Sequence, residues 1–298
     1  MKRILLSLLF VAVAVAIQAQ DAAGVLSLAR RVNDYFVAQN PDPTKPTFVK
    51  KKRTSNLWTR AVYYEGLMDL YSVDPDKRYL EYTDRWGVYH KWTARGSVDD
   101  TNADNQCCEQ TYIDRFAATG DSVMIAPTTE NLNHQMATGR KNYWWWIDAI
   151  QMAMPVYAKY AKISGDRHYL DYAMDCYRDA RDRRGLFNIA DGLWWRDSVY
   201  KAPYKEPDGK NCYWSRGNGW VYAALVRVMK TVDADDPYYK ELLKDYLLMT
   251  HALVKLQRRD GYWNASLVST NYAGPEMTGT ALFLYGMAWG VRNGILNA

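Results

Sequence analysis

Two aromatic-rich segments carry the side chains best suited to chemistry. Residues 214–220 read Trp-Ser-Arg-Gly-Asn-Gly-Trp, and residues 144–148 read Trp-Trp-Trp-Ile-Asp. Indole rings stack on the faces of sugars, a guanidinium binds a carboxylate through two parallel hydrogen bonds, and glycines allow close backbone approach. This equipment indicates a carbohydrate-active enzyme whose ligand includes an acidic, uronic sugar.

The elements that position these side chains are predicted to be helices, because apolar residues recur with helical periodicity and strand-like alternation is lacking. Each of the two segments runs directly into an apolar helix, so its polar groups lie at a helix N-terminus, where anions are favoured. The expected helices cover residues 22–39, 55–72, 76–93, 105–117, 129–138, 146–163, 167–183, 217–232, 237–257 and 278–292.

An internal repeat indicates how these helices pair. Residues 76–82 (DKRYLEY) recur as residues 166–172 (DRHYLDY) and, more weakly, as residues 236–242 (DPYYKEL). Each copy follows an apolar helix, and its first residue, aspartate, is a favoured N-cap for the next one. Repeated helical hairpins bury their faces only against one another, which predicts an all-α toroid or a solenoid.

The even-numbered helices are the more apolar, so we expect them to form an inner ring with the others outside. Their N-terminal ends would then share one face of the ring. The candidate site residues at or near these ends are Trp58, Asp104, Asp148, Arg216, Glu276 and Thr278.

The two ends of the chain suggest export and an unfinished ring. Lys2 and Arg3 precede an apolar stretch over residues 4–17, and a small-residue cleavage site lies before Gln20, which predicts a signal peptide over residues 1–19. The mature protein is expected in the periplasm or outside the cell, free of the membrane. Residues 20–298 read as one domain that stops after the tenth of twelve helices and lacks the last hairpin.

Composition argues against other classes of function. The net charge is +5, and the densest basic run, residues 50–53, suits a solvated loop better than nucleic-acid binding. The spacing of Cys107, Cys108, Cys176 and Cys212 identifies no disulfide and favours buried free thiols. The four histidines are scattered and form no zinc motif. No metal and no organic cofactor is expected.

The motifs resemble a known family. Trp146-Ile147-Asp148 with Met152 and Pro155, then residues 214–220 and 260–263, look like glycoside hydrolase families 88 and 105, from about Trp58 to the C-terminus. The resemblance implies an (α/α)6 barrel. It also implies substrates left by polysaccharide lyases, oligosaccharides whose terminal uronic acid carries a C4=C5 double bond.

The resemblance also implies roles for single residues. Asp148 would protonate C4 of the enol ether while water adds at C5, after which the hemiketal opens and expels the remaining sugar chain. A proton donor needs a raised pKa, which burial among tryptophans and the nearby Asp104 would provide. Residues 194–197 depart from a His-containing motif of the family. The expected sugar contacts are Trp58, Trp146, Trp195, Trp214, Arg216, Asn218 and Trp220.

Two alternatives stay open at this point. Asp104 and Asp148 could be the acid and base of a conventional inverting glycosidase, which requires a separation of roughly 6.5–9.5 Å. A barrel without its last hairpin could also be a non-catalytic oligosaccharide-binding remnant. The sugar attached to the uronate, its linkage and the oligomeric state are not determined by the sequence.

Overall fold

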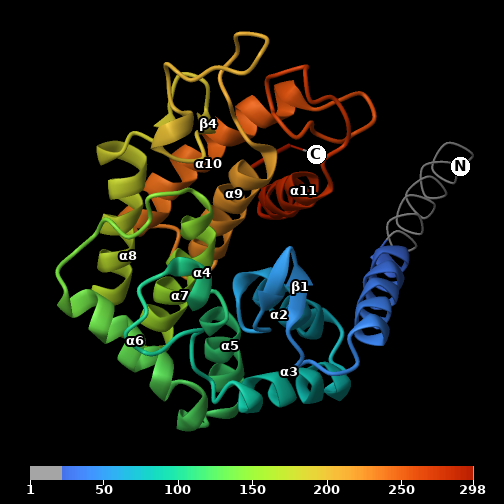
Figure 1. Ribbon diagram of the computed structural model, residues 1–298, viewed down its shortest axis with the longest axis vertical. Helices are drawn as coiled ribbons and strands as arrows, with labels where there is room; N and C mark the ends of the chain where they lie inside the picture. The colour runs from blue at the N-terminus through green and yellow to red at the C-terminus, as the bar shows by residue number, and fades with distance from the viewer. Residues whose placement is uncertain (1–21, 298) are drawn as a thin grey trace, which may run out of the picture.

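The computed structural model describes residues 22–297, so the predicted signal peptide lies outside the described residues. Helices dominate, and they follow one another as antiparallel hairpins (Figure 1). Their bounds are 22–39, α2 Trp58–Val73, α3 Lys77–Tyr89, α4 Ala103–Gln106, α5 Glu109–Thr119, α6 Ala126–Ala137, α7 Asp148–Ser164, α8 His168–Arg178, α9 Ser215–Met229, α10 Pro237–Leu256 and α11 Met277–Arg292.

The hairpins form the two layers expected from the apolar pattern. Helices α2, α5, α7, α9 and α11 lie inside, and residues 22–39 with α3, α6, α8 and α10 run along the outside (Figure 1). Most residues of α7 and α9 are buried, whereas α2 and α11, at the two ends of the inner arc, bury mainly one face. The predicted all-α hairpin architecture is confirmed, while the expected absence of a last hairpin stays a prediction.

Two of the three repeated aspartates, Asp76 and Asp236, are helix N-caps, and Asp166 lies one residue before the N-cap of α8. Asp76 accepts a hydrogen bond from the Arg78 amide at 2.9 Å at the start of α3, and Asp236 accepts one from the Tyr238 amide at 2.8 Å at the start of α10. Asp166 accepts the equivalent bond from the amide of His168, also at 2.9 Å. These bonds satisfy amides that have no partner within the helix, so the repeat marks where outer helices begin.

One expectation about local structure was wrong. The helix predicted over residues 105–117 is divided into α4 and α5 at Cys107 and Cys108, where backbone bonds such as Thr111 N to Cys108 O span three residues instead of four. Two short antiparallel hairpins are also present: β1 Thr47–Val49 with β2 Lys51–Arg53, and β3 Phe187–Asn188 with β4 Leu193–Trp194. Strands of two or three residues are too short to show alternation in the sequence.

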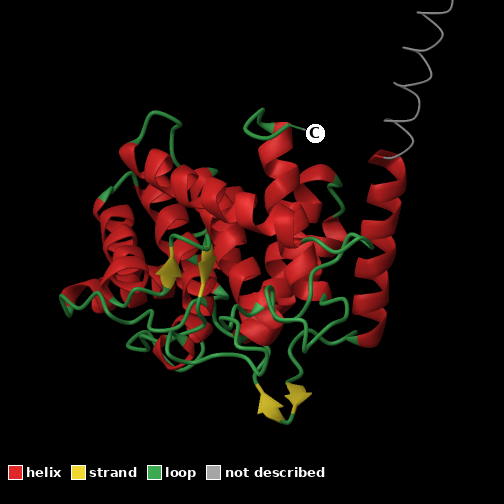
Figure 2. Cartoon of the chain, turned by 90° about the horizontal axis from the view of Figure 1, so that it is seen from above, coloured by secondary structure: helices red, strands yellow, loops and turns green. Residues whose placement is uncertain are grey.

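The longer loops gather at one end of the helices, together with the β1–β2 hairpin, while the last turn of α11 lies at the opposite end (Figure 2). The loop-rich end is where the inner helices begin. Among residues 22–297, no helix combines the length and apolar character needed to cross a bilayer.

Candidate active site

Backbone bridges between loops hold the N-terminal ends of the inner helices together. Trp146, just before α7, pairs with Asp197, and Trp214, just before α9, pairs with Ser266. Glu276, just before α11, pairs with Trp263. Each helix start is therefore fixed by a segment distant in sequence, which allows side chains from three inner helices to face one another.

Asp148 is the first residue of α7 and is buried. Its residue is 7% exposed, and its Oδ2 atom is buried with no hydrogen-bond partner among residues 22–297. Burial, with a smaller contribution from the neighbouring Asp104 carboxylate, raises the pKa of Asp148 to about 6, while a backbone hydrogen bond at Asp148 and the charges of Arg196 and Arg216 oppose the rise. A carboxyl group with these properties is protonated in a useful fraction of molecules near neutral pH.

Asp104 lies in the first turn of α4, which Asn102 caps by accepting a hydrogen bond from the Asp104 amide at 2.9 Å. Burial raises the pKa of Asp104 to about 6, and Arg53 at the end of β2 opposes this rise. The two predicted catalytic carboxylates thus lie close enough to influence each other. Their similar pKa values allow one to be protonated while the other is ionised.

Arg216 in the first turn of α9 is the cation that the sequence predicted for a ligand carboxylate. Its guanidinium lies over the Trp214 ring, 4.2 Å from the ring centroid, and is partly exposed. Its one ion-pair contact within the described residues is a long one, 3.9 Å from Nη1 to Glu276 Oε1. The stacked indole restrains the guanidinium, which leaves it available to an anionic ligand.

Arg196 and Arg53 were not expected in the site. Arg196 is brought there by a backbone bond from Ile147 N to Arg196 O at 2.9 Å, which places it beside Asp148. Its Nη1 atom also donates to Asp197 Oδ2 at 2.8 Å. The sequence distinguishes Arg196 only as part of a segment that departs from a family motif, and Arg53 only as part of a basic run.

The predicted tryptophans differ in how much they face solvent. Trp58 and Trp220 pack edge to face, with ring centroids 6.3 Å apart, and Trp220 is mostly buried. Trp146 is also mostly buried and contacts Trp145, whose residue is 51% exposed. Trp145 therefore exposes more ring surface than Trp146 does, although the sequence predicts that Trp145 helps to bury Asp148. Trp195 and Trp214 are partly exposed.

Asn218 was predicted to contact the sugar, and the structure contradicts this expectation. The residue is 0% exposed. Its Oδ1 atom accepts from Trp194 N at 2.8 Å, and its Nδ2 atom donates to Trp194 O at 2.9 Å and to Trp214 O at 3.0 Å. All three of these hydrogen bonds go to backbone groups, so Asn218 joins β4 to the start of α9.

We expect Asn218→Ala to lower the free energy of unfolding by about 2–4 kcal/mol, because it leaves buried backbone groups of Trp194 without partners. Urea unfolding followed by tryptophan fluorescence measures the change. Asn293→Ala, at the exposed end of α11, is the matched control and should cost no more than about 0.5 kcal/mol. Equal, small losses for both variants would show that the Asn218 amide does not hold the loop.

A cavity of about 310 Å³ adjoins the site and shares two of its residues, Arg196 and Trp214. Tyr200 and Tyr272 provide further aromatic surface, and the Cys212 side chain also lines it. A mostly apolar cavity of this size, lined by aromatic rings and adjoining the Asp148 site, suits one sugar unit in addition to the one at Asp148.

The described residues contain no group of three or more His, Cys, Asp or Glu side chains arranged to hold a metal ion. Cys107, Cys108, Cys176 and Cys212 are all free, and the first three are buried. The side chains assembled here are therefore two carboxyl groups of raised pKa, guanidinium groups beside them and a surround of indoles. This arrangement can donate a proton to an anionic ligand held against aromatic rings.

Comparisons with known proteins agree with this chemistry. The sequence profile of Glycosyl Hydrolase Family 88 matches residues 28–298. A relative in Alteromonas sp. (strain LOR), an unsaturated 3S-rhamnoglycuronyl hydrolase, is 29% identical over 300 residues, which cover 91% of this chain and 71% of the relative.

Two solved structures are similar over most of their length. One is a glycosyl hydrolase family 88 protein from Bacteroides vulgatus, with 33% identity, a TM-score of 0.83 and coverage of 92% of this chain and 80% of the other. The second is described as a polysaccharide lyase and has 30% identity, a TM-score of 0.84 and coverage of 92% and 79%.

Proposed function

The chain belongs to Glycosyl Hydrolase Family 88 and is a glycoside hydrolase, and from this premise we propose that it removes a terminal 4,5-unsaturated uronic acid from oligosaccharides produced by polysaccharide lyases. The observation that carries the proposal is the Asp148 carboxyl group, which is buried, has one unpartnered oxygen and lies beside two guanidinium groups. An acid of raised pKa next to cations suits an anionic substrate that must be protonated.

We propose hydration of the C4=C5 double bond as the chemical step. Asp148 donates its proton to C4, which leaves positive charge at C5, shared with the ring oxygen. A water molecule then adds at C5 and loses a proton to the Asp148 carboxylate, so the acid is regenerated. The resulting hemiketal opens and the rest of the oligosaccharide leaves from C1.

The other residues orient the substrate and tune the acid. Arg216 binds the uronate carboxylate, restrained by its stacking on Trp214. Asp104 raises the pKa of Asp148 and accepts hydrogen bonds from sugar hydroxyls. Ionised Asp104 also stabilises the positive charge that develops at C5 in the transition state.

The next sugar along the chain would occupy the cavity of about 310 Å³ beside Trp214. The Alteromonas relative acts, by its name, on an unsaturated rhamnoglycuronyl substrate, which supports a rhamnose-type sugar attached to the uronate. Pectic rhamnogalacturonan fragments and related acidic oligosaccharides are the substrate class we propose.

Ultraviolet absorbance tests the proposal directly, because the conjugated double bond absorbs. The purified protein is incubated with a panel of lyase-generated unsaturated oligosaccharides, and the released sugar is separated by chromatography. Absorbance should fall as the terminal uronic acid is released. An increase in absorbance on intact polysaccharide would instead indicate a lyase, and no change across the panel would contradict the proposal.

Turnover should depend on pH in a defined direction. Asp148 must be protonated to act, and its pKa is about 6, so kcat should decline as the pH rises through about 6. Initial rates with saturating substrate across this range measure the profile. A kcat that increases through the same interval would show that Asp148 acts first as a base, not as an acid.

We also propose that the protein is exported to the periplasm or the cell exterior, on the basis of residues 1–19. N-terminal sequencing of the protein recovered from cell fractions should find Gln20 first in the exported form. An uncleaved chain confined to the cytoplasm would contradict export.

A further inference from the structure

We propose that Glu65, in the middle of α2, is a positioning residue that sets the spacing of Asp104 and Asp148. Glu65 lies about two helical turns after Trp58, which is roughly 10 Å along the helix axis from the loop-rich end. Glu65 therefore lies beneath the site and does not contact substrate. Its catalytic meaning rests on the proposed function, whereas its structural effect does not.

One carboxylate accepts hydrogen bonds from both elements that carry the predicted catalytic residues. Oε1 of Glu65 accepts from Cys107 Sγ at 3.1 Å and from Gln110 Nε2 at 3.0 Å, and Oε2 accepts from Gln151 Nε2 at 2.9 Å. The first two donors lie at the α4–α5 junction and on α5, and the third lies on α7. The three donors and the acceptor are all buried.

These donors are close in sequence to the reacting groups. Cys107 follows Asp104 by three residues, and Gln151 follows Asp148 by three residues, about one helical turn in each case. Gln110 also donates to the backbone carbonyl of Gln151 at 2.9 Å, which joins α5 to α7 directly. A shift of either helix start relative to the other would break at least one of these buried bonds, and broken buried bonds are costly.

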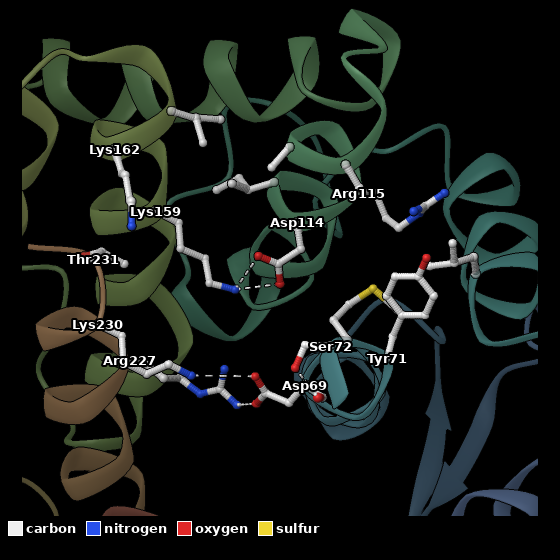
Figure 3. A pocket seen from close by; sticks show the side chains of 16 residues that line it. Asp69, Tyr71, Ser72, Asp114, Arg115, Lys159, Lys162, Arg227, Lys230 and Thr231 are labelled. Atoms are coloured by element: carbon white, nitrogen blue, oxygen red, sulfur yellow. Dashed lines mark hydrogen bonds and ion pairs between the residues drawn. The ribbon is translucent and has the colours of Figure 1, made fainter. Parts of the chain in front are cut away.

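Glu65 is also held by the charge of a nearby arginine. Arg227 on α9 places Nη2 at 3.6 Å from Glu65 Oε2 and at 3.2 Å from Asp69 Oδ2. Figure 3 shows Arg227 reaching across a cavity of about 580 Å³ toward Asp69, beside the separate Lys159–Asp114 pair. Burial raises the pKa of Glu65 above its ordinary value, while the charge of Arg227 and the hydrogen bond from Cys107 act against this rise.

Glu65→Gln tests the inference with a minimal change of shape. A neutral amide presents an NH2 group to side chains that also donate, so the network must rearrange. We expect kcat to fall roughly 10- to 100-fold, as misplacement of catalytic groups by about 1 Å does, while KM changes less than about threefold. The decline of kcat with pH should also move to lower pH, because Asp104 and Asp148 would separate.

Two further variants separate positioning from general destabilisation. Asp245→Asn removes a comparable buried acceptor, which binds Tyr177 and Arg181 at 2.8 and 2.7 Å, between α8 and α10. It should lower stability but leave the pH profile unchanged. Gln151→Met removes one donor while keeping volume, and serves if Glu65→Gln does not fold; it should change kcat in the same direction to a smaller extent.

A readout that needs no turnover keeps this inference distinct from the proposed function. Carboxyl carbons of labelled aspartate are titrated by NMR in the parent and in Glu65→Gln or Gln151→Met. The pKa of Asp148 should fall in the variants, because a more distant Asp104 raises it less while burial still acts, and should stay constant in Asp245→Asn. Unaltered aspartate titrations in both network variants would overturn the positioning role, whereas an inactive parent with altered titrations would overturn only the proposed function.

Discussion

Asp148→Asn should reduce kcat by roughly 10²–10⁴-fold, which is the contribution that a positioned general acid makes. The amide has nearly the shape of the carboxyl group but has no proton acidic enough for C4. Substrate affinity should change little, because Arg216 and the tryptophans that hold the sugar are untouched. Initial rates from the fall in ultraviolet absorbance, together with calorimetric binding of an unsaturated disaccharide, measure both quantities.

The same variant should be more stable than the parent at alkaline pH. The folded-state pKa of Asp148 is raised from 3.8 to about 6, so its favourable contribution to folding is complete below the unfolded value and is lost as the pH rises through about 6. This shift of the Asp148 pKa corresponds to a loss of at most about 3 kcal/mol in the free energy of unfolding. The stability advantage of Asp148→Asn should therefore grow between about pH 4 and about pH 8.

Asp76→Asn is the control for the activity measurement on Asp148→Asn, because Asp76 caps α3 on the outside of the ring and lies away from the site. It should retain the activity of the parent. If Asp148→Asn kept its activity within about tenfold of the parent, the group would contribute less than a general acid does, and another residue would have to supply the proton.

Arg216→Ala should weaken binding of the unsaturated uronate by roughly 10- to 150-fold, equivalent to a charge-assisted hydrogen-bond contribution of about 1.5–3 kcal/mol. The methyl ester of the same sugar lacks the charge and should lose much less affinity. Calorimetric titration of both ligands gives the difference. Equal losses for acid and ester would show that Arg216 supports Trp214 and Glu276 instead of binding the carboxylate.

Arg183→Ala controls for the loss of one positive charge from the molecule. Arg183 ends the short π-helical segment Asp179–Arg183 that follows α8, is exposed, and pairs with Asp179 at 3.3 Å. It should bind the acid and the ester as the parent does. Arg216→Lys adds a second comparison: a point charge without the planar fork should recover only part of the affinity for the acid.

The sequence predicts the framework of the site because helix signals are local. The aspartates at positions 76 and 236 cap outer helices, as their repeated context indicates, and apolar periodicity separates the inner from the outer layer. The position of Asp148 at the start of α7 follows from the same local pattern. Once the inner helices are assigned to one ring, the encounter of their N-terminal ends requires no long-range information.

Contacts made by loops were not predictable in this way. Arg196 reaches Asp148 because residues 146 and 197 pair across about fifty residues of sequence, and no local pattern signals that pairing. Asn218 lies between glycines and therefore resembles a ligand-binding amide, yet its partners are backbone groups of Trp194, 24 residues earlier. Glu65 is one acid within an amphipathic helix, and its donors become visible only in three dimensions.

A matched pair of oligosaccharides tests the central claim most directly. The two share the same linkage and the same attached sugar, and differ only in whether the terminal uronic acid has the C4=C5 double bond. Hydration needs that bond, whereas a conventional glycosidase protonates the glycosidic oxygen that both substrates contain. The account predicts that the protein releases the terminal sugar from the unsaturated member, with loss of absorbance, and leaves the saturated member intact. Comparable cleavage of both members would contradict it.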